Sequence, residues 1–179
     1  MNTTDNNEFL AALFSKQINA EIEKENNLFG LFVGEWEFDW YGYEQDMEAQ
    51  HEKGEWIFSY VLEGRAIQDI WIIPERKRRN TGGLPKGEYG TTIRFYNDEL
   101  KVWQVIWVGP LKNRFTIFEA RKTGNEIVME EMNNPNQKMR WIFSDMTDNS
   151  FKWRSVISEN NGKTWTLSQE MIVKRKPNN

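Results

Sequence analysis

The chain has 179 residues, a net charge of −4 and no cysteine. Its length is that of one domain able to bury a core, and its charge argues against general affinity for nucleic acid. Without cysteine there is no disulfide, thiolate nucleophile or cysteine metal site. The first residues lack a basic segment followed by an apolar run, and no apolar stretch reaches the length of a membrane span. We therefore expect a cytoplasmic protein.

Residues 5–27 predict an N-terminal helix. Leu10, Phe14, Ile18 and Ile22 recur every four residues and form an apolar stripe on an otherwise acidic helix. We expect this stripe to pack against the rest of the protein. The alternative uses of the stripe are a contact with a second copy, which would make a homodimer, and a mobile lid.

From Gly34 onward the apolar period changes from four residues to two. Trp36, Phe38 and Trp40 alternate with acidic residues, as in a half-buried strand. Similar segments follow along the rest of the chain, and none contains an internal proline. They span residues 54–62, 65–73, 89–96, 101–108, 113–121, 126–132, 138–146, 150–158 and 165–174.

The connections between these segments alternate between short and long. The short ones are 63–64, 97–99, 123–125 and 147–149, and the longer ones are 43–53, 74–88, 109–112, 133–137 and 159–163. In an antiparallel meander every second connection lies at the same end, so one end is pinched and the other is an open mouth. We predict an all-β fold: a ten-stranded antiparallel up-and-down β-barrel over residues 31–179, preceded by an N-terminal helical segment, residues 1–30.

The start of the first strand reads Gly34-Glu35-Trp36. The parity of the connections brings Lys174 and Arg175, at the end of the last strand, to the same closed end. This pattern resembles the lipocalins and the wider calycin superfamily, in which a tryptophan at the start of the first strand packs against a basic residue of the last. The resemblance implies a structural role for Trp36 as the barrel floor.

A longer resemblance covers about residues 33 to 175. The segments 62–71, 90–96, 140–145 and 150–154 are similar to bacterial lipocalin-like domains of unknown function. That resemblance implies a small single-domain barrel of the calycin type. It implies no particular reaction and no particular ligand.

Nine tryptophans are more than an ordinary core needs, and most of them alternate with polar residues on one face of a strand. A barrel of ten strands is wide enough to leave a cavity. We therefore expect a binding module for a small hydrophobic or aromatic molecule, with no cofactor. The candidate ligand-binding residues are Trp56, Tyr60, Gln68, Arg94, Trp103, Trp107 and Trp153.

Two other functions stay open. The cavity could serve a cofactor-free enzyme of the isomerase, cyclase or hydratase type, in which Glu119 or Asp69, helped by Arg94, would transfer protons. A barrel filled by its own side chains would instead be a scaffold that acts through its surface. It also stays open which polar residues face the interior: the parity is uncertain in at least three strands, and the strand at 65–73 has an acceptable inner face in either parity.

The single histidine and one basic run complete the candidates. His51 lies among acidic residues in the first long connection, and one histidine cannot build a multi-histidine metal site or a catalytic triad. We expect no metal site. The basic run Glu75-Arg76-Lys77-Arg78-Arg79 is either a solvated loop or a gate that attracts an anionic ligand.

Overall fold

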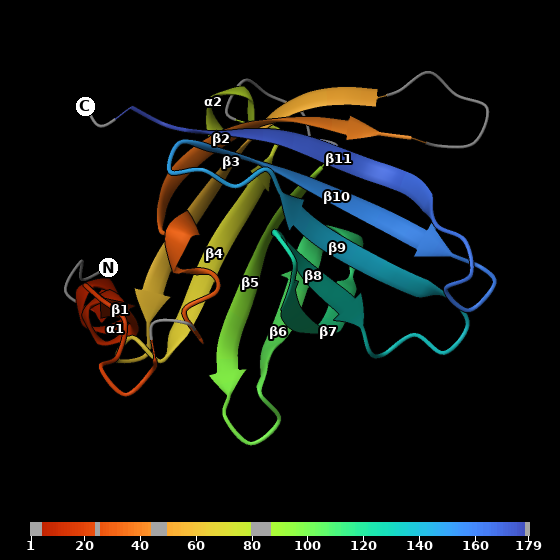
Figure 1. The fold of residues 1–179 in the computed structure, drawn as a ribbon. Helices are drawn as coiled ribbons and strands as arrows, with labels where there is room; N and C mark the ends of the chain where they lie inside the picture. The colour runs from red at the N-terminus through yellow and green to blue at the C-terminus, as the bar shows by residue number, and fades with distance from the viewer. Residues whose placement is uncertain (1–4, 24–25, 44–49, 80–86, 178–179) are drawn as a thin grey trace.

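The computed structural model describes residues 5–23, 26–43, 50–79 and 87–177. Ten strands form one antiparallel sheet that closes on itself, because β3 pairs with both β2 and β4 and β11 returns to β2 (Figure 1). The barrel strands are β2 (Gly34–Gly42), β3 (Gln50–Val61), β4 (Ala66–Ile73), β5 (Glu88–Asn97), β6 (Val102–Gly109), β7 (Arg114–Thr123), β8 (Glu126–Glu131), β9 (Lys138–Ser144), β10 (Ser150–Ser158) and β11 (Thr166–Arg175).

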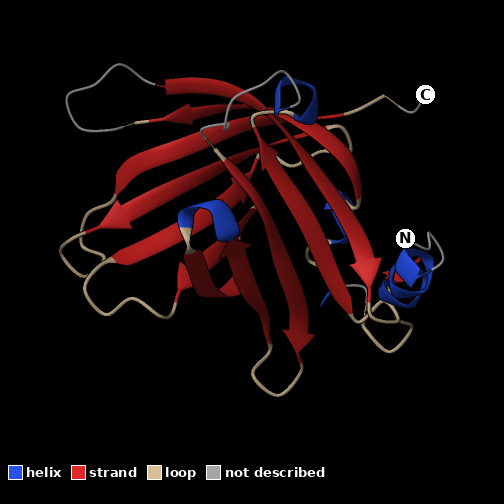
Figure 2. Cartoon of the chain, turned by 180° about the vertical axis from the view of Figure 1, so that it is seen from behind, coloured by secondary structure: helices blue, strands red, loops and turns tan. Residues whose placement is uncertain are grey.

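The predicted all-β barrel and its ten strands are confirmed. Strands such as β2, β6 and β7 alternate between a buried and a more exposed face, as the period of two requires. Glycines at positive φ stand in two of the tight turns, Gly64 at 75° and Gly124 at 61°. The helical elements are few and short, and they include α2 (Arg76–Arg79) and the 3-10 turn η3 (Pro110–Lys112) (Figure 2). In the described parts of the chain, no helix has the length and apolar character to cross a bilayer.

The N-terminal helix is much shorter than the sequence predicts. Helix α1 (Asp5–Leu13) ends where β1 (Phe14–Ser15) pairs with Val61 and Tyr60 of β3. Strand β2 begins opposite Phe58, so the last residues of β3 have free backbone groups on that side. These groups take the chain after Leu13, and a tertiary pairing overrides the helical pattern.

The predicted apolar stripe does not pack against the barrel. Phe9, Leu10 and Phe14 are each more than half exposed. The stripe is broken because α1 ends at Leu13, so Ile18 and Ile22 no longer share a helix with Leu10.

The segment between α1 and β2, rather than a helix, closes the pinched end of the barrel. Phe29 and Phe32 have no exposed surface, and the 3-10 turn η2 (Gly30–Phe32) holds them there. Phe32 packs against Phe58, Phe143 and Phe151, with ring centroids 4.7 to 5.7 Å apart. The barrel floor is therefore an aromatic plug supplied from outside the sheet.

The predicted partnership of Trp36 with the last strand is confirmed, and Arg175 is the basic residue. Its guanidinium lies 4.0 Å from the centroid of the Trp36 ring and donates hydrogen bonds to the carbonyl oxygens of Leu31, Val33 and Asp148. Gly34 has φ of 126°, and a Cβ at this position would lie 2.6 Å from the Arg175 guanidinium. The glycine thus allows the arginine to reach the floor.

The structure settles which face of each strand points inward. On β4 the inner face carries Ile67, Asp69 and Trp71. Asp69 marks this face, because it forms an ion pair with Arg94 of the neighbouring strand β5 and both side chains are buried. Gln68 consequently points outward, where its side-chain amide donates to Thr91.

Candidate functional site

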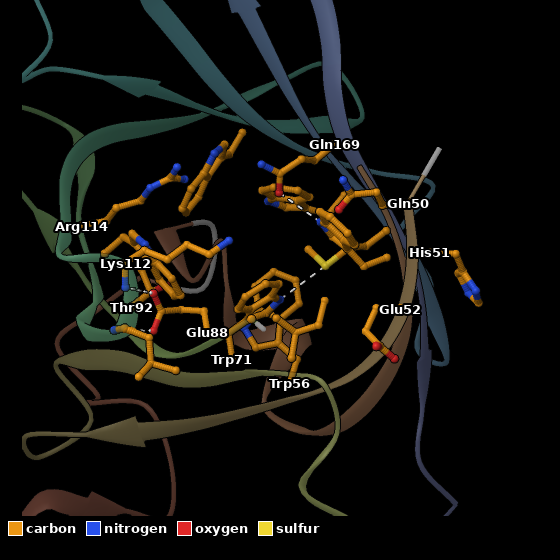
Figure 3. Close-up of a pocket in the computed structure, with 18 of the residues that line it drawn as sticks. Gln50, His51, Glu52, Trp56, Trp71, Glu88, Thr92, Lys112, Arg114 and Gln169 are labelled. Carbon is orange, nitrogen blue, oxygen red and sulfur yellow. Dashed lines mark hydrogen bonds between the residues drawn. The ribbon is translucent and has the colours of Figure 1, made fainter. Parts of the chain in front are cut away.

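A cavity of about 830 Å³ occupies the half of the barrel away from the aromatic plug. Figure 3 shows the residues that line it. Its rim is made by the ends of β3, β5, β7 and β11 and by η3, which lie where the long connections join the strands. This volume is in the range of sites for small organic molecules. Six tryptophans line it: Trp40, Trp56, Trp71, Trp107, Trp141 and Trp153.

Four of these rings form a continuous edge-to-face chain around the wall. Trp71 contacts Trp107, Trp107 contacts Trp141, and Trp141 contacts Trp153, with centroids 5.9, 5.9 and 5.4 Å apart and interplanar angles of 81°, 72° and 66°. Aromatic pairs favour this geometry. Since neighbouring rings hold one another, the wall is a preformed surface rather than a set of independent side chains.

The indole N–H groups of this wall are not all satisfied. Trp40 donates to the side-chain oxygen of Gln169 at 3.0 Å, and Trp71 donates to the sulfur of Met171 at 3.4 Å. The buried Nε1 of Trp153 has no hydrogen-bond partner among the described residues. A buried donor without a partner destabilises the protein by about 1–3 kcal/mol, because its hydrogen bond to water is lost and not replaced. A bound molecule that places an acceptor atom here would recover part of this free energy.

A buried ion pair lies below the cavity. Asp69 and Arg94 are each about 1 % exposed and are joined by a hydrogen bond from the guanidinium, and neither lines the cavity. Burial raises the pKa of Asp69, while the charge of Arg94 and the nearby Trp56 indole oppose that rise. The Trp56 N–H faces this carboxylate without reaching hydrogen-bond geometry.

Glu88 is a buried carboxylate of the rim, and it serves the backbone. Its oxygens accept from the N–H groups of Tyr89, Leu111 and Lys112 at 2.9 to 3.1 Å. These contacts tie β5 to η3. Glu88 thereby fixes η3, from which the Lys112 side chain enters the cavity (Figure 3).

The basic run forms the short helix α2, whose side chains are largely exposed to solvent, and ion pairs anchor it to the barrel. Arg76 binds Glu55 through its backbone N–H and its guanidinium, and Arg78 forms an ion pair with Glu52. The hydrogen bonds from Arg76, joined by the ammonium group of Lys176, lower the pKa of Glu55 to about 2 in spite of its burial. These contacts hold α2 against β3.

His51 does not take part in the interior of the cavity. Its ring stacks on Tyr41 at 4.9 Å, its Nε2 lies 2.8 Å from an Asp39 oxygen, and it is directed away from the tryptophans (Figure 3). It is a surface residue of the rim.

Three of the seven predicted ligand-binding residues line the cavity: Trp56, Trp107 and Trp153. Three others belong to the closed half. Tyr60 accepts from the Asn27 amide, Trp103 donates to the Asn26 carbonyl, and Arg94 forms the buried pair described above.

The seventh predicted residue, Gln68, lies on the outer face, and so does Glu119, where it is paired with Arg121. Sequence reasoning missed Trp71, because the inner face of β4 was ambiguous. It also missed Lys112 and Arg114, which lie where a long connection joins β7. Because the sequence predicts that the long connections surround the mouth, this position in the sequence could have identified both residues as candidates.

No protein-family model and no curated protein matches the sequence. Several solved structures share the fold, among them the following two. Rv2717c from M. tuberculosis has a TM-score of 0.52 at 8% identity, with 88% of this chain and 100% of that chain covered. The S-type phycobiliprotein lyase CPES from Guillardia theta has a TM-score of 0.55 at 11% identity, with 90% and 100% covered. At these identities the likeness shows the fold alone, which is consistent with a lipocalin-like barrel of the calycin type.

Proposed function

We propose that this protein binds a small, largely apolar or aromatic molecule inside the barrel. The observation that carries the proposal is the cavity of about 830 Å³ walled by six tryptophans. Flat rings set edge to face present broad apolar surfaces, which suit a flat or elongated ligand. The unpartnered Nε1 of Trp153 favours a ligand that also has a hydrogen-bond acceptor.

The alternatives have less support. A scaffold would fill its barrel with its own side chains, whereas this barrel is filled only in its closed half. For an enzyme, the nominated carboxylates are badly placed, because Asp69 lies below the cavity and Glu119 lies outside the barrel. One fold neighbour is named a phycobiliprotein lyase, and that supports only the idea that a barrel of this shape can receive a ligand.

The test is a titration with 1-pyrenebutanol, an uncharged molecule with a flat aromatic body. Excited tryptophans transfer energy to a pyrene held beside them, so binding should quench the protein emission and sensitise that of pyrene. We expect saturable binding to one site per chain, with a Kd of about 1–10 μM.

Two substitutions separate the cavity from the surface. Trp107→Leu removes a ring from the wall and should weaken binding about tenfold or more. Trp165→Leu is the matched control, since Trp165 packs under Arg140 and does not line the cavity. Circular dichroism verifies that both variants are folded. Unsaturable quenching of the wild type, or equal weakening by both substitutions, would overturn the proposal in favour of the scaffold.

A further inference from the structure

We infer that the ligand is an organic anion whose acidic group is held at the mouth by Lys112 and Arg114, with its apolar body among the tryptophans. This inference rests on the proposed function and specifies the ligand class for the same site. It is carried by the balance of charges around the rim, by the lack of partners for these two cations, and by the way both are built into the wall.

The acidic groups of the rim are already committed. Glu52 is paired with Arg78, and Glu88 receives its hydrogen bonds from three backbone N–H groups. Neither carboxylate forms an ion pair with Lys112 or Arg114 in the described structure. Among the described residues, those that line the cavity or form an ion pair with a lining residue include four cations, Arg78, Arg79, Lys112 and Arg114, and three carboxylates, Asp39, Glu52 and Glu88. The described rim thus has a local excess of one positive charge, on a chain whose net charge is −4.

Two of these cations are used by the protein itself. Arg79 donates to the carbonyl oxygens of Ile73 and Glu88 and lies over the ring of Tyr89. Arg78 is committed to Glu52. By contrast, no hydrogen bond or ion pair with a described residue engages the side chains of Lys112 and Arg114, although both line the cavity.

Both free cations stand on rigid backbone and point inward. Arg114 is the first residue of β7 and has the same parity as Thr116 and Phe118, which face the barrel interior. Lys112 closes η3, which the Glu88 carboxylate pins, and Asn113 turns the chain into β7 at a φ of 51°. Figure 3 shows the two side chains extending from one wall into the space between the tryptophans.

The arrangement gives the ligand a direction. An acidic group at the rim stays partly hydrated and contacts two cations, while the flat apolar body lies deeper in the cavity, among the tryptophans. The unpartnered Trp153 N–H is available to a second acceptor further along the body. A carboxylate at the other end of the ligand would be buried among the tryptophans and would lose its hydration there, which is unfavourable for a charged group.

The experiment compares three probes with one body and different ends: 1-pyrenebutanoate, 1-pyrenebutanol and a pyrenebutyl trimethylammonium salt. For the wild type at low ionic strength, we expect the carboxylate to bind about fivefold to tenfold more tightly than the alcohol, and the ammonium to bind most weakly. The advantage of the carboxylate should shrink as salt is added, because ions screen exposed charges.

The test variant is Lys112→Gln/Arg114→Gln, and the control is Arg121→Gln/Lys122→Gln. The control removes the same charge from the far end of β7, the strand that Arg114 begins. The test variant should lose the preference for the carboxylate over the alcohol while binding the alcohol within about twofold of the wild type. The control should keep the preference, and melting curves verify that both variants are folded.

The outcomes separate this inference from the proposed function. If the alcohol binds but the carboxylate is not preferred, or if both double variants reduce the preference equally, the head-group site is wrong and the cavity proposal stands. Equal weakening of all three probes by Lys112→Gln/Arg114→Gln would also overturn it, because the two residues would then only shape the rim. Failure of every probe to bind the wild type would overturn the proposed function itself.

Discussion

At the scale of single residues, one arginine connects the last strand of the barrel to the segment that enters the first. Arg175 lies at the end of β11 and binds carbonyl oxygens of the segment that enters β2 and of the turn between β9 and β10. Its guanidinium also covers Trp36, whose own N–H donates to the Phe32 carbonyl at 2.6 Å. Removing the guanidinium would leave several carbonyl groups at the floor without a donor.

Arg175→Ala should therefore lower the free energy of unfolding by about 2–4 kcal/mol, since hydrogen bonds from charged groups are worth more than neutral ones. Lys174→Ala is the control on the neighbouring residue, because Lys174 points outward and is exposed. It should change stability by less than about 0.5 kcal/mol. Urea denaturation followed by tryptophan fluorescence measures both, and equal losses would contradict the role assigned to Arg175.

At the scale of elements, Glu55 is the carboxylate of β3 that forms the most hydrogen bonds with α2. Glu55 accepts hydrogen bonds from the Arg76 backbone and guanidinium and from Lys176, so it ties both α2 and the end of the chain to the sheet. Hydrogen bonding by Arg76 lowers the pKa of Glu55 from 4.5 to about 2. A carboxylate with a lowered pKa stabilises the fold above its unfolded pKa, and this contribution is lost as the pH falls through the folded value.

We therefore expect Glu55→Gln to reduce stability by about 2–3 kcal/mol at pH 7. The difference from the wild type should shrink as the pH is lowered from about 4.5 toward 2, because Glu55 itself becomes neutral. Urea titrations at a series of pH values measure this difference. A gap that stays constant over that interval would show that the charge of Glu55 is not what holds α2.

The two N-terminal elements differ in what they bury. The described side chains of α1 from Glu8 to Ala12 are exposed, whereas Phe32 in the floor is completely buried. Deleting residues 1–12 should keep the barrel folded and cost less than about 1 kcal/mol. Phe32→Ala should cost about 3–5 kcal/mol, as for other large core truncations. Thermal and urea unfolding of the two variants test this contrast, and a larger loss from the deletion would contradict it.

The strands could be predicted from sequence because their signals are local. Alternation marks each strand, and tight-turn residues such as Glu63-Gly64 mark the hairpins. The end of α1 could not be predicted, because it is set by the free backbone of Tyr60 and Val61, far along the chain. The role of Phe29 and Phe32 was hidden for the same reason, since their partners are on β3, β9 and β10.

At the scale of the whole molecule, the barrel is divided into a filled half and an open half. Sequence reasoning predicted an aromatic interior but could not locate this division, so Tyr60, Trp103 and Arg94 were assigned to the site although they belong to the filled half. The division depends on how far the plug around Phe29 reaches into the barrel. Phe29 packs against Trp103, with ring centroids 5.3 Å apart, and fills the space below the Asp69–Arg94 pair.

Because one half of the barrel is open, a substitution that fills the cavity should stabilise the protein and at the same time weaken ligand binding. Thr92 lines the cavity on β5, between Asp69 of β4 and Trp107 of β6, and is almost completely buried. Thr92→Phe would place a ring among the tryptophans. We expect it to keep or raise the free energy of unfolding, by up to about 1 kcal/mol, because filling a cavity commonly stabilises a protein whose site is kept open for function.

The same substitution should weaken 1-pyrenebutanol about tenfold or more, since the new ring takes the space of the probe. Thr116→Phe is the matched control: Thr116 faces inward opposite Trp107 on β7 but does not line the cavity. A ring at this position would overpack the wall and lower the free energy of unfolding by about 1–3 kcal/mol. The Kd of the folded protein for 1-pyrenebutanol should stay within about threefold of the wild-type value. Urea unfolding and pyrene titration of the two variants measure both quantities. A Thr92→Phe protein that is destabilised like the control and still binds the probe at wild-type strength would show that the open half is not the binding site.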